Sequence, residues 1–271
     1  MTMTMPVACA QMACATFDRR SNLAKADHFI QEAAHLGAQL ILLPELLTSG
    51  YTYDRRLHDF AEPIGGATTR WLQRRSRQTG RWIGAGMVEA ADEGIFDTFL
   101  LTGPAGECLS YRKLYPAFFE KLYFHRGRTA GIFDTPIGRI GMMICWDMVH
   151  ARLYREMAGR IDLLLVCSAW PDLNQGNIPL FGIRDWMSRQ PAQRPLQLAQ
   201  KLNVPVAYCN MTGAFTTRVP GLGLTYRSPF AGSSSIADGR GKIAMAAPGK
   251  ETVLVADVRV GNGEPPRKKA G

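Results

Sequence analysis

The feature that most constrains the fold of this chain is an alternation of apolar runs with amphipathic segments. The strand-like run QLILL at 39–43 follows a segment whose apolar residues recur with helical spacing. The residues on that helical face are Leu23, Ala26, Ile30, Ala33 and Ala34. An apolar strand after an amphipathic helix indicates a sheet whose outer face is covered by helices. The pattern therefore predicts an α/β fold.

Local signals set the expected helix boundaries. Ser21 or Asn22 is suited to cap the first helix, because a short polar side chain can accept a hydrogen bond from a free backbone N–H. A second helix is expected to begin near Thr68 or Thr69 and to end at Gly80. The strand RWIGAGMV follows it, and the small residues of that strand favour close packing.

The rest of the chain continues the alternation. The segments FDTFLLTG and ECLSYRK meet at a Gly-Pro-Ala-Gly turn and predict a hairpin, so the sheet is mixed. Further strands are expected at 138–145, 161–170, 204–210, 233–246 and 251–258. Because there is no internal repeat and no linker, we expect one domain of two packed sheets over 1–261. The Gly, Pro and Lys content of 262–271 predicts a flexible basic tail.

The cysteine pattern and the apolar runs bear on location. Six cysteines are scattered without a C-x-x-C pair, which is typical neither of a disulfide framework nor of a zinc site. They are expected to be free thiols in a reducing compartment. No run approaches the roughly eighteen apolar residues of a membrane span, and the N-terminus lacks the features of a signal peptide. These observations predict a cytoplasmic protein without a membrane partner.

The charge pattern bears on ligands. The formal net charge is +9, but Lys and Arg are spread along the chain, and no basic helix is interleaved with stacking aromatic residues. Nucleic acid is therefore not expected as a partner. His28, His35, His58 and His125 show neither paired spacing nor a carboxylate cluster, so no metal site is expected.

Three residues with chemical potential each follow a predicted strand: Glu45 after LILLP, Lys113 after ECLSYR and Cys145 after RIGMMI. Strand ends in α/β folds deliver side chains into a crevice. A thiol becomes a useful nucleophile when a base takes its proton or when positive charge stabilises the thiolate. Glu45 and Lys113 are of the right types for these roles, although a surface location would explain each of them separately.

These residues lie in motifs that resemble those of the nitrilase superfamily, the carbon-nitrogen hydrolases. The motifs are PELLTSGY at 44–51, YRKLYP at 111–116 and GRIGMMICWD at 138–147, in the family's order. The resemblance implies a four-layer α-β-β-α sandwich with a catalytic triad of Glu45, Lys113 and Cys145. It also implies a second glutamate at the position of Glu120, no cofactor or metal, and a homodimer or higher homo-oligomer.

The implied mechanism is nucleophilic catalysis on a small molecule. Glu45 takes the proton of Cys145, the thiolate attacks, and Lys113 and the Trp146 N–H hold the oxyanion. EKLYF and ICWD look most like the amide and N-carbamoyl branch, which predicts hydrolysis of such a compound to acid plus ammonia. RKLYPAFFE also resembles nitrilases, so a nitrile is the alternative substrate. A non-catalytic dimeric regulatory module with this fold is the alternative of another class.

Further residues near these motifs are candidates for substrate contact. Trp146 and Trp170 follow strand ends and are expected to contact substrate, with core packing as the alternative. Arg126 and Arg128 could bind a carboxylate, but solvated surface is the expected location. The sequence departs from the family where Val149 and His150 replace a Pro-Glu pair, and where Lys201 stands near a glutamate's place. His150, one helical turn beyond Cys145, is expected to point away from it.

Overall fold

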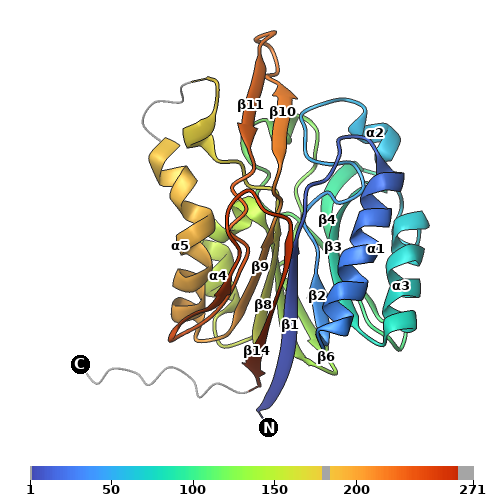
Figure 1. Cartoon of the computed structure of the whole chain (residues 1–271). Coiled ribbons are helices and arrows are strands. Elements are labelled where there is room, and N and C mark those ends of the chain that lie inside the picture. Colours follow the sequence, from blue (N-terminus) through green and yellow to red (C-terminus); the bar gives the residue numbers. More distant parts are fainter. Residues whose placement is uncertain (1, 179–183, 262–271) are drawn as a thin grey trace.

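A computed structural model describes residues 2–178 and 184–261. Two six-stranded mixed sheets pack face to face, and helices cover the outer face of each sheet (Figure 1). This is the expected four-layer α-β-β-α sandwich. The expected tail at 262–271 lies outside the described residues, so it stays a prediction.

The first sheet has the strand order β14-β1-β2-β3-β4-β5. Its pairs β1–β2 and β2–β3 are parallel, while β3–β4 and β4–β5 are antiparallel, as the predicted hairpin requires. Its strands are β1 (Met3–Gln11), β2 (Leu40–Leu42), β3 (Trp82–Ala91), β4 (Gly94–Thr102), β5 (Cys108–Arg112) and β14 (Thr252–Val260).

The second sheet has the order β13-β12-β9-β8-β7-β6, with β7–β8 and β8–β9 parallel. Parallel neighbours bring their carboxyl ends to one edge, which here faces the same end of the sandwich as the end of β2 (Figure 1). Its strands are β6 (Gly131–Thr135), β7 (Gly138–Ile144), β8 (Leu163–Ser168), β9 (Val206–Asn210), β12 (Ser235–Asp238) and β13 (Gly241–Met245).

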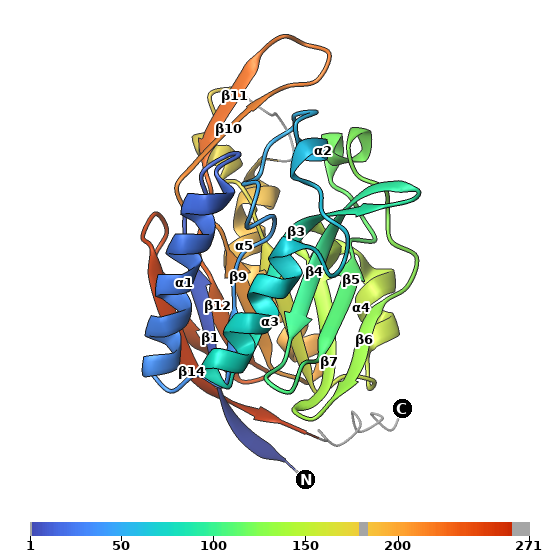
Figure 2. The same cartoon turned by 90° about the vertical axis from the view of Figure 1, so that its right-hand side faces the viewer.

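Helices α1 (Arg19–His35) and α3 (Ala67–Thr79) lie side by side on the first sheet (Figure 2). Helices α4 (Ala151–Met157) and α5 (Arg184–Leu202) cover the second, and the short α2 (Leu57–Phe60) precedes α3. No helix among the described residues is both long and apolar enough to cross a membrane.

The predicted caps were partly wrong. The N-cap of α1 is Asp18, whose carboxylate accepts a hydrogen bond from the Ser21 N–H, so the helix begins earlier than predicted. At α3, the buried carboxylate of Glu62 accepts hydrogen bonds from the Thr68 N–H and hydroxyl, which supplies the cap from outside the helix. The expected stop at Gly80 is confirmed, and its left-handed backbone has φ of 68°.

Two apolar layers follow from the alternation of side chains along each strand. In β2 and just beyond it, Leu40 and Leu42 join the core between the sheets, whereas Ile41 and Leu43 join the core beneath α1 and α3. A strand buried on both faces must be apolar at every position, which explains the unbroken run in the sequence. All of these side chains are fully buried.

The sequence did not reveal the two-stranded hairpin of β10 (Ala214–Arg218) and β11 (Thr225–Pro229). Its strands alternate outward and inward side chains without an apolar run, so they lack the signal that marked the other strands. The hairpin projects beyond the sheets at the end of the sandwich where β2 and β7 finish (Figure 1).

Candidate active site

Glu45 lies just beyond β2 and is fully buried. The chain reaches it by close contact with β3, because a Cβ on Gly86 would lie 2.6 Å from the Glu45 Cα. The backbone N–H of Gly86 donates to the Pro44 carbonyl at 3.0 Å, and that of Leu47 donates to the Gly86 carbonyl at 2.9 Å. The small residues predicted to allow close packing in this strand therefore hold the loop of Glu45 in place.

Lys113 directly follows β5, and its ammonium group is surrounded by carboxylates. The Nζ donates to Glu45 Oε1 at 2.6 Å, to Glu120 Oε1 at 3.0 Å and to Asp97 Oδ2 at 3.1 Å. Each of the four side chains is at most 1% exposed. An ammonium has three N–H donors, so these contacts use its full capacity and fix its position.

Glu45 and Glu120 each have a second anchor. Glu45 Oε2 accepts a hydrogen bond from the Ala169 N–H at 2.6 Å, which ties it to the end of β8 in the second sheet. Glu120 accepts from the Ala117 N–H at 2.7 Å and from the Tyr51 hydroxyl. Glu45 thus joins the two sheets through side-chain bonds at the edge where their strands end.

Asp97 was missed at the sequence level. It lies on β4, and its carbonyl accepts from the Lys113 N–H at 2.9 Å, which places the two residues opposite each other on neighbouring strands. The available signal was an acidic residue inside the otherwise apolar strand FDTFLL, because such a residue must find a partner if the strand is buried. Its Oδ1 atom has no hydrogen-bond partner among the described residues.

The charges of this cluster shift one another. Burial disfavours the Lys113 ammonium, but Glu120, Glu45 and Asp97 outweigh burial and hold the pKa of Lys113 well above its usual range. Burial raises the pKa of Asp97 well above its ordinary value, with Lys113 acting against the rise and Glu45 adding to it. Lys113 is therefore cationic at neutral pH and suited to stabilise negative charge.

Cys145 stands where β7 turns into the 3₁₀ helix η2 (Cys145–Val149). Its φ of 46° lies in the left-handed region, which costs a residue other than glycine about 1–3 kcal/mol and is concentrated at functional sites. Leu46 and Phe118, which lie close in sequence to Glu45 and Glu120, share this conformation with φ of 46° and 41°. Backbone strain thus occurs in all three segments that supply the site.

The Asp147 side chain holds the turn at Cys145. Its carboxylate accepts from the Ile144 N–H at 3.1 Å, from the Tyr111 hydroxyl at 2.8 Å and from the Tyr115 N–H at 2.9 Å. These bonds connect the segment of Cys145 with the strand and loop that flank Lys113. Burial raises the pKa of Asp147 to about 6, although Lys113 and these hydrogen bonds act against the rise.

The Cys145 thiol is buried, and the charges of Glu45, Lys113 and Glu120 act on it. Burial raises the pKa of this thiol well above its ordinary value, and Glu45 raises it further, while Lys113 opposes both. The thiol is therefore protonated at neutral pH, and a base must take its proton before it can attack. Glu45, whose carboxylate is held by Lys113 and Ala169, is the base of the right type.

Cys145 opens into a cavity of about 260 Å³ whose walls are aromatic and aliphatic. Trp146 and Trp170 both line it, with their ring centroids 5.3 Å apart. The hairpin that the sequence did not reveal supplies part of the opposite wall. The aromatic lining residues are Tyr51, Tyr53, Phe118, Phe119, Trp146, Trp170, Phe215 and Tyr226.

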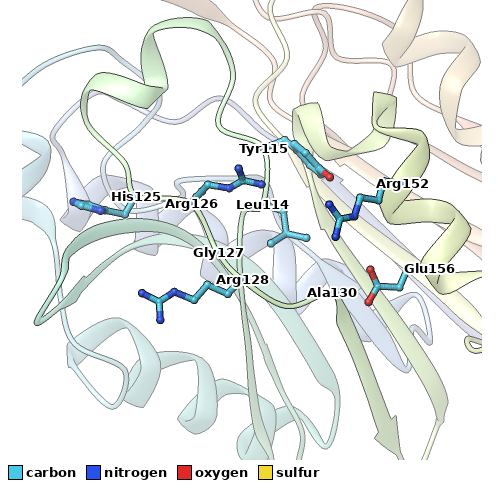
Figure 3. Close-up of a pocket in the computed structure, with 9 residues that line it drawn as sticks. All are labelled: Leu114, Tyr115, His125, Arg126, Gly127, Arg128, Ala130, Arg152 and Glu156. Atoms are coloured by element: carbon cyan, nitrogen blue, oxygen red, sulfur yellow. The ribbon is translucent and has the colours of Figure 1, made fainter.

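Arg126 and Arg128 lie elsewhere. Both are exposed and line a different hollow of about 460 Å³, together with Arg152 and Glu156 from α4 (Figure 3). This agrees with the expected solvated location. His150 stacks on Tyr115 with ring centroids 3.8 Å apart and does not line the cavity at Cys145.

One group of acidic side chains has the spacing of a metal site. Oxygen atoms of Glu45, Asp97 and Glu120 lie within 4.8 Å of one another. The Lys113 ammonium, however, already contacts all three side chains. The positive charge that these carboxylates require is thus supplied by the chain itself.

Comparisons with known proteins show the family of this chain. The model of the carbon-nitrogen hydrolase family matches residues 6–267. Over 156 residues the chain is 34% identical to a nitrilase from Pyrococcus abyssi, and over 159 residues it is 32% identical to the omega-amidase NIT2 of Homo sapiens. These matches cover 56% and 55% of the chain, and the chain spans less than two thirds of these relatives, 60% and 57% of their lengths.

Solved structures share the fold over nearly the whole chain. A carbon-nitrogen hydrolase superfamily protein from Xanthomonas campestris superposes with a TM-score of 0.77 at 21% identity, over 94% of this chain and 91% of that one. An amidase from Nesterenkonia sp. superposes with a TM-score of 0.75 at 23% identity, over 94% and 90% of the two chains. With its family match across the whole sandwich, the chain belongs to the carbon-nitrogen hydrolases of the nitrilase superfamily.

Proposed function

We propose that this protein hydrolyses a small carboxamide to the carboxylic acid and ammonia, with Cys145 as the nucleophile. The observation that carries the proposal is the placement of a strained, buried cysteine at the aromatic cavity, within the electrostatic influence of Glu45 and Lys113. A purely structural core would not need three buried carboxylates around one ammonium group, because burying charge is costly.

In the first half of the reaction, Glu45 removes the proton from the Cys145 thiol as sulfur attacks the amide carbon. A carbon–sulfur bond forms and the carbonyl electrons move to oxygen, where the Lys113 ammonium and the Trp146 N–H stabilise the oxyanion. The tetrahedral intermediate then collapses, the carbon–nitrogen bond breaks, and Glu45 returns its proton to the leaving nitrogen. Ammonia departs and a thioester on Cys145 remains.

In the second half, Glu45 takes a proton from water as that water attacks the thioester carbon. The carbon–sulfur bond breaks, Glu45 gives the proton to the leaving sulfur, and the acid is released with the thiol and the Glu45 carboxylate restored. Glu120 is proposed to position Lys113 throughout, because its carboxylate contacts the Lys113 ammonium at 2.8 Å and is itself anchored by Ala117. Trp146 and Trp170 are proposed to contact the acyl group of the substrate, since both line the cavity.

Two other substrate types are open to the same chemistry. An N-carbamoyl compound offers a carbonyl carbon with a leaving nitrogen, as the sequence resemblance suggested. A nitrile offers an electrophilic carbon to the same thiolate, and the relative from Pyrococcus abyssi bears the name nitrilase. The products distinguish them, because panels of amides, N-carbamoyl compounds and nitriles, analysed for acid, amide, amine and ammonia, separate the three reactions.

The test is ammonia release from a panel of primary amides by the purified full chain, combined with intact mass measurement. We expect Cys145→Ala to abolish turnover and the acyl adduct, because the nucleophile is lost, and we expect Glu45→Gln to abolish turnover, because both half-reactions lose their proposed base. Cys108→Ser is the matched control, because Cys108 lies at the start of β5 and is half-buried, outside the cavity.

One outcome would overturn the hydrolase proposal. If folded protein with a free Cys145 thiol neither releases ammonia nor gains mass across amides, N-carbamoyl compounds and nitriles, the hydrolase proposal is wrong. A non-catalytic role would then be favoured. The expected homo-oligomer stays a prediction, which sedimentation velocity would check separately.

A further inference from the structure

We infer that the substrate of this site carries an uncharged acyl group, aromatic or arylaliphatic, and that acyl groups bearing a carboxylate are rejected. The inference rests on the proposed hydrolase function and narrows it. Three observations support it: the cavity wall carries no charged side chain among the described residues, the arginines of the β10–β11 hairpin point away from the cavity, and the Lys113 ammonium is already paired with carboxylates.

The cavity wall has no charged side chain among the described residues that line it. Apart from Cys145, the tyrosine hydroxyls and the tryptophan N–H groups, the polar side chain among the described lining residues is that of Thr217. The Thr217 hydroxyl is already used, since it accepts from the Tyr53 N–H at 2.8 Å and lies 3.2 Å from the Thr52 hydroxyl. Residues 179–183 lie outside the described part of the chain, and their sequence, PLFGI, contains no charged residue.

The hairpin directs its charges away from the cavity. In β10 the inward positions are Phe215 and Thr217, whereas Arg218 is exposed. In β11 the inward residue Tyr226 pairs with Thr217, whereas Arg227 is exposed. Because side chains alternate along a strand, both arginines lie on the outer face. No guanidinium of this hairpin is available to an acyl group in the cavity.

The Lys113 ammonium, which among the described residues is the cation that acts on Cys145, is also unavailable to a substrate carboxylate. The Lys113 ammonium already contacts Glu45, Asp97 and Glu120, so the charges behind the nucleophile include more carboxyl groups than ammonium groups. A carboxylate in the cavity would be desolvated without a partner and would face these like charges. Burying an unpaired ion is strongly unfavourable, whereas a neutral ring is not penalised in this way.

Aromatic geometry favours a ring as the occupant. Phe118 and Trp146 have centroids 5.2 Å apart with planes at 52°, and Phe215 and Tyr226 lie 5.8 Å apart at 60°. Rings at these angles present both faces and edges, which suits an additional aromatic group in a tilted contact. A volume of about 260 Å³ limits the substrate to a small one.

The test uses two amides of nearly equal shape, 4-nitrobenzamide and 4-carbamoylbenzoate. The nitro group has the shape of a carboxylate but no net charge, so the pair isolates charge from size. We expect kcat/KM at neutral pH to be at least about 100-fold higher for the nitro compound, because an unpaired buried charge costs several kcal/mol and 1.4 kcal/mol is a factor of ten. Equal or better turnover of the carboxylate would overturn the inference and leave the hydrolase proposal intact.

A variant pair sharpens the test. Val219 lines the cavity just beyond β10, and Val219→Lys places an ammonium group at its wall. We expect this variant to lower the ratio of kcat/KM for 4-nitrobenzamide to that for 4-carbamoylbenzoate at least about tenfold, since the carboxylate gains a partner. Thr216→Lys adds the same charge at an exposed position of β10 and should leave the ratio unchanged. A ratio that moves equally in both variants would contradict the inference.

Binding to the Cys145→Ala variant separates this inference from the chemistry. Calorimetry should detect 4-nitrobenzamide and not 4-carbamoylbenzoate. If this binding preference is found while no amide is hydrolysed by the unmodified protein, the cavity preference is supported and the hydrolase proposal fails. If neither compound binds, or the carboxylate binds more tightly, the inference is overturned.

Discussion

Two clusters of charge lie on opposite sides of one loop and have opposite properties. Gly127, between Arg126 and Arg128, donates its N–H to the Lys113 carbonyl at 2.8 Å, so their backbones touch. The Lys113 ammonium is buried against three carboxylates, whereas the arginine side chains line an open hollow with Arg152 (Figure 3). Both clusters combine basic and acidic side chains. Burial and partners decide which charge can do chemistry and which is screened by water.

Removing the buried cation should have the largest effect. We expect Lys113→Met to lower kcat by at least about 1000-fold, because the proposed oxyanion stabiliser is lost. The free energy of unfolding should fall by about 3–5 kcal/mol, since the carboxylates of Glu45, Asp97 and Glu120 lose their common partner. Ammonia release and urea denaturation measure the two effects, with Arg128→Met as the control of similar chemical change. Activity within tenfold of the unmodified protein would refute the role assigned to Lys113.

Disturbing the close backbone contact between Gly86 and Glu45 should have the second-largest effect on activity. A Cβ on Gly86 would lie 2.6 Å from the Glu45 Cα, so Gly86→Ala displaces the proposed base and should cost about 1–3 kcal/mol of stability. We expect kcat to fall about 100-fold, since misplacement by about 1 Å has this effect. Gly84→Ala is the matched control on the same strand, because its Cβ would meet side-chain atoms of Phe99 and Leu42 instead. Equal loss of activity in both variants would show that stability, and not position, is responsible.

The contribution of Asp147 to the pH dependence of the free energy of unfolding should be a smaller effect than the two above, and its sign follows from the pKa shift of this carboxyl. Burial raises the pKa of this carboxyl from 3.8 to about 6, so between these values the folded state binds more protons than the unfolded state. The contribution of Asp147 to the free energy of unfolding therefore falls as pH rises through this window, by up to about 3 kcal/mol, and is constant above it. Asp147→Asn should remove this slope in denaturation curves measured from pH 4 to pH 7. An unchanged slope would assign the titration to other groups.

Substitutions in the exposed arginine cluster should have the smallest effect on stability and activity. We expect Arg152→Ala to change the free energy of unfolding by no more than about 0.5 kcal/mol and to leave kcat unchanged, because its guanidinium lines an open hollow away from Cys145. The same two measurements apply, with Lys113→Met as the opposite extreme. A loss of activity in Arg152→Ala comparable with that of Lys113→Met would abolish the distinction between the two clusters.

The sequence by itself determined the layers and the candidate triad. Apolar runs such as the one ending at Leu43 predicted buried strands, because a strand covered on both faces must be apolar at each position. The positions of Glu45, Lys113 and Cys145 after such strands, with the family motifs around them, predicted one site. The structure brings these residues together with Glu120, as expected from the resemblance.

Only the tertiary structure decided the environment of that site. Asp97 and the Ala169 N–H contact the cluster through pairing across strands and between sheets, which depends on register and not on local pattern. The hairpin residues Phe215 and Tyr226 line the cavity although no apolar run marks their strands. Sequence periodicity reports which side of an element is buried, whereas the shape and charge of a cavity depend on which distant elements meet there.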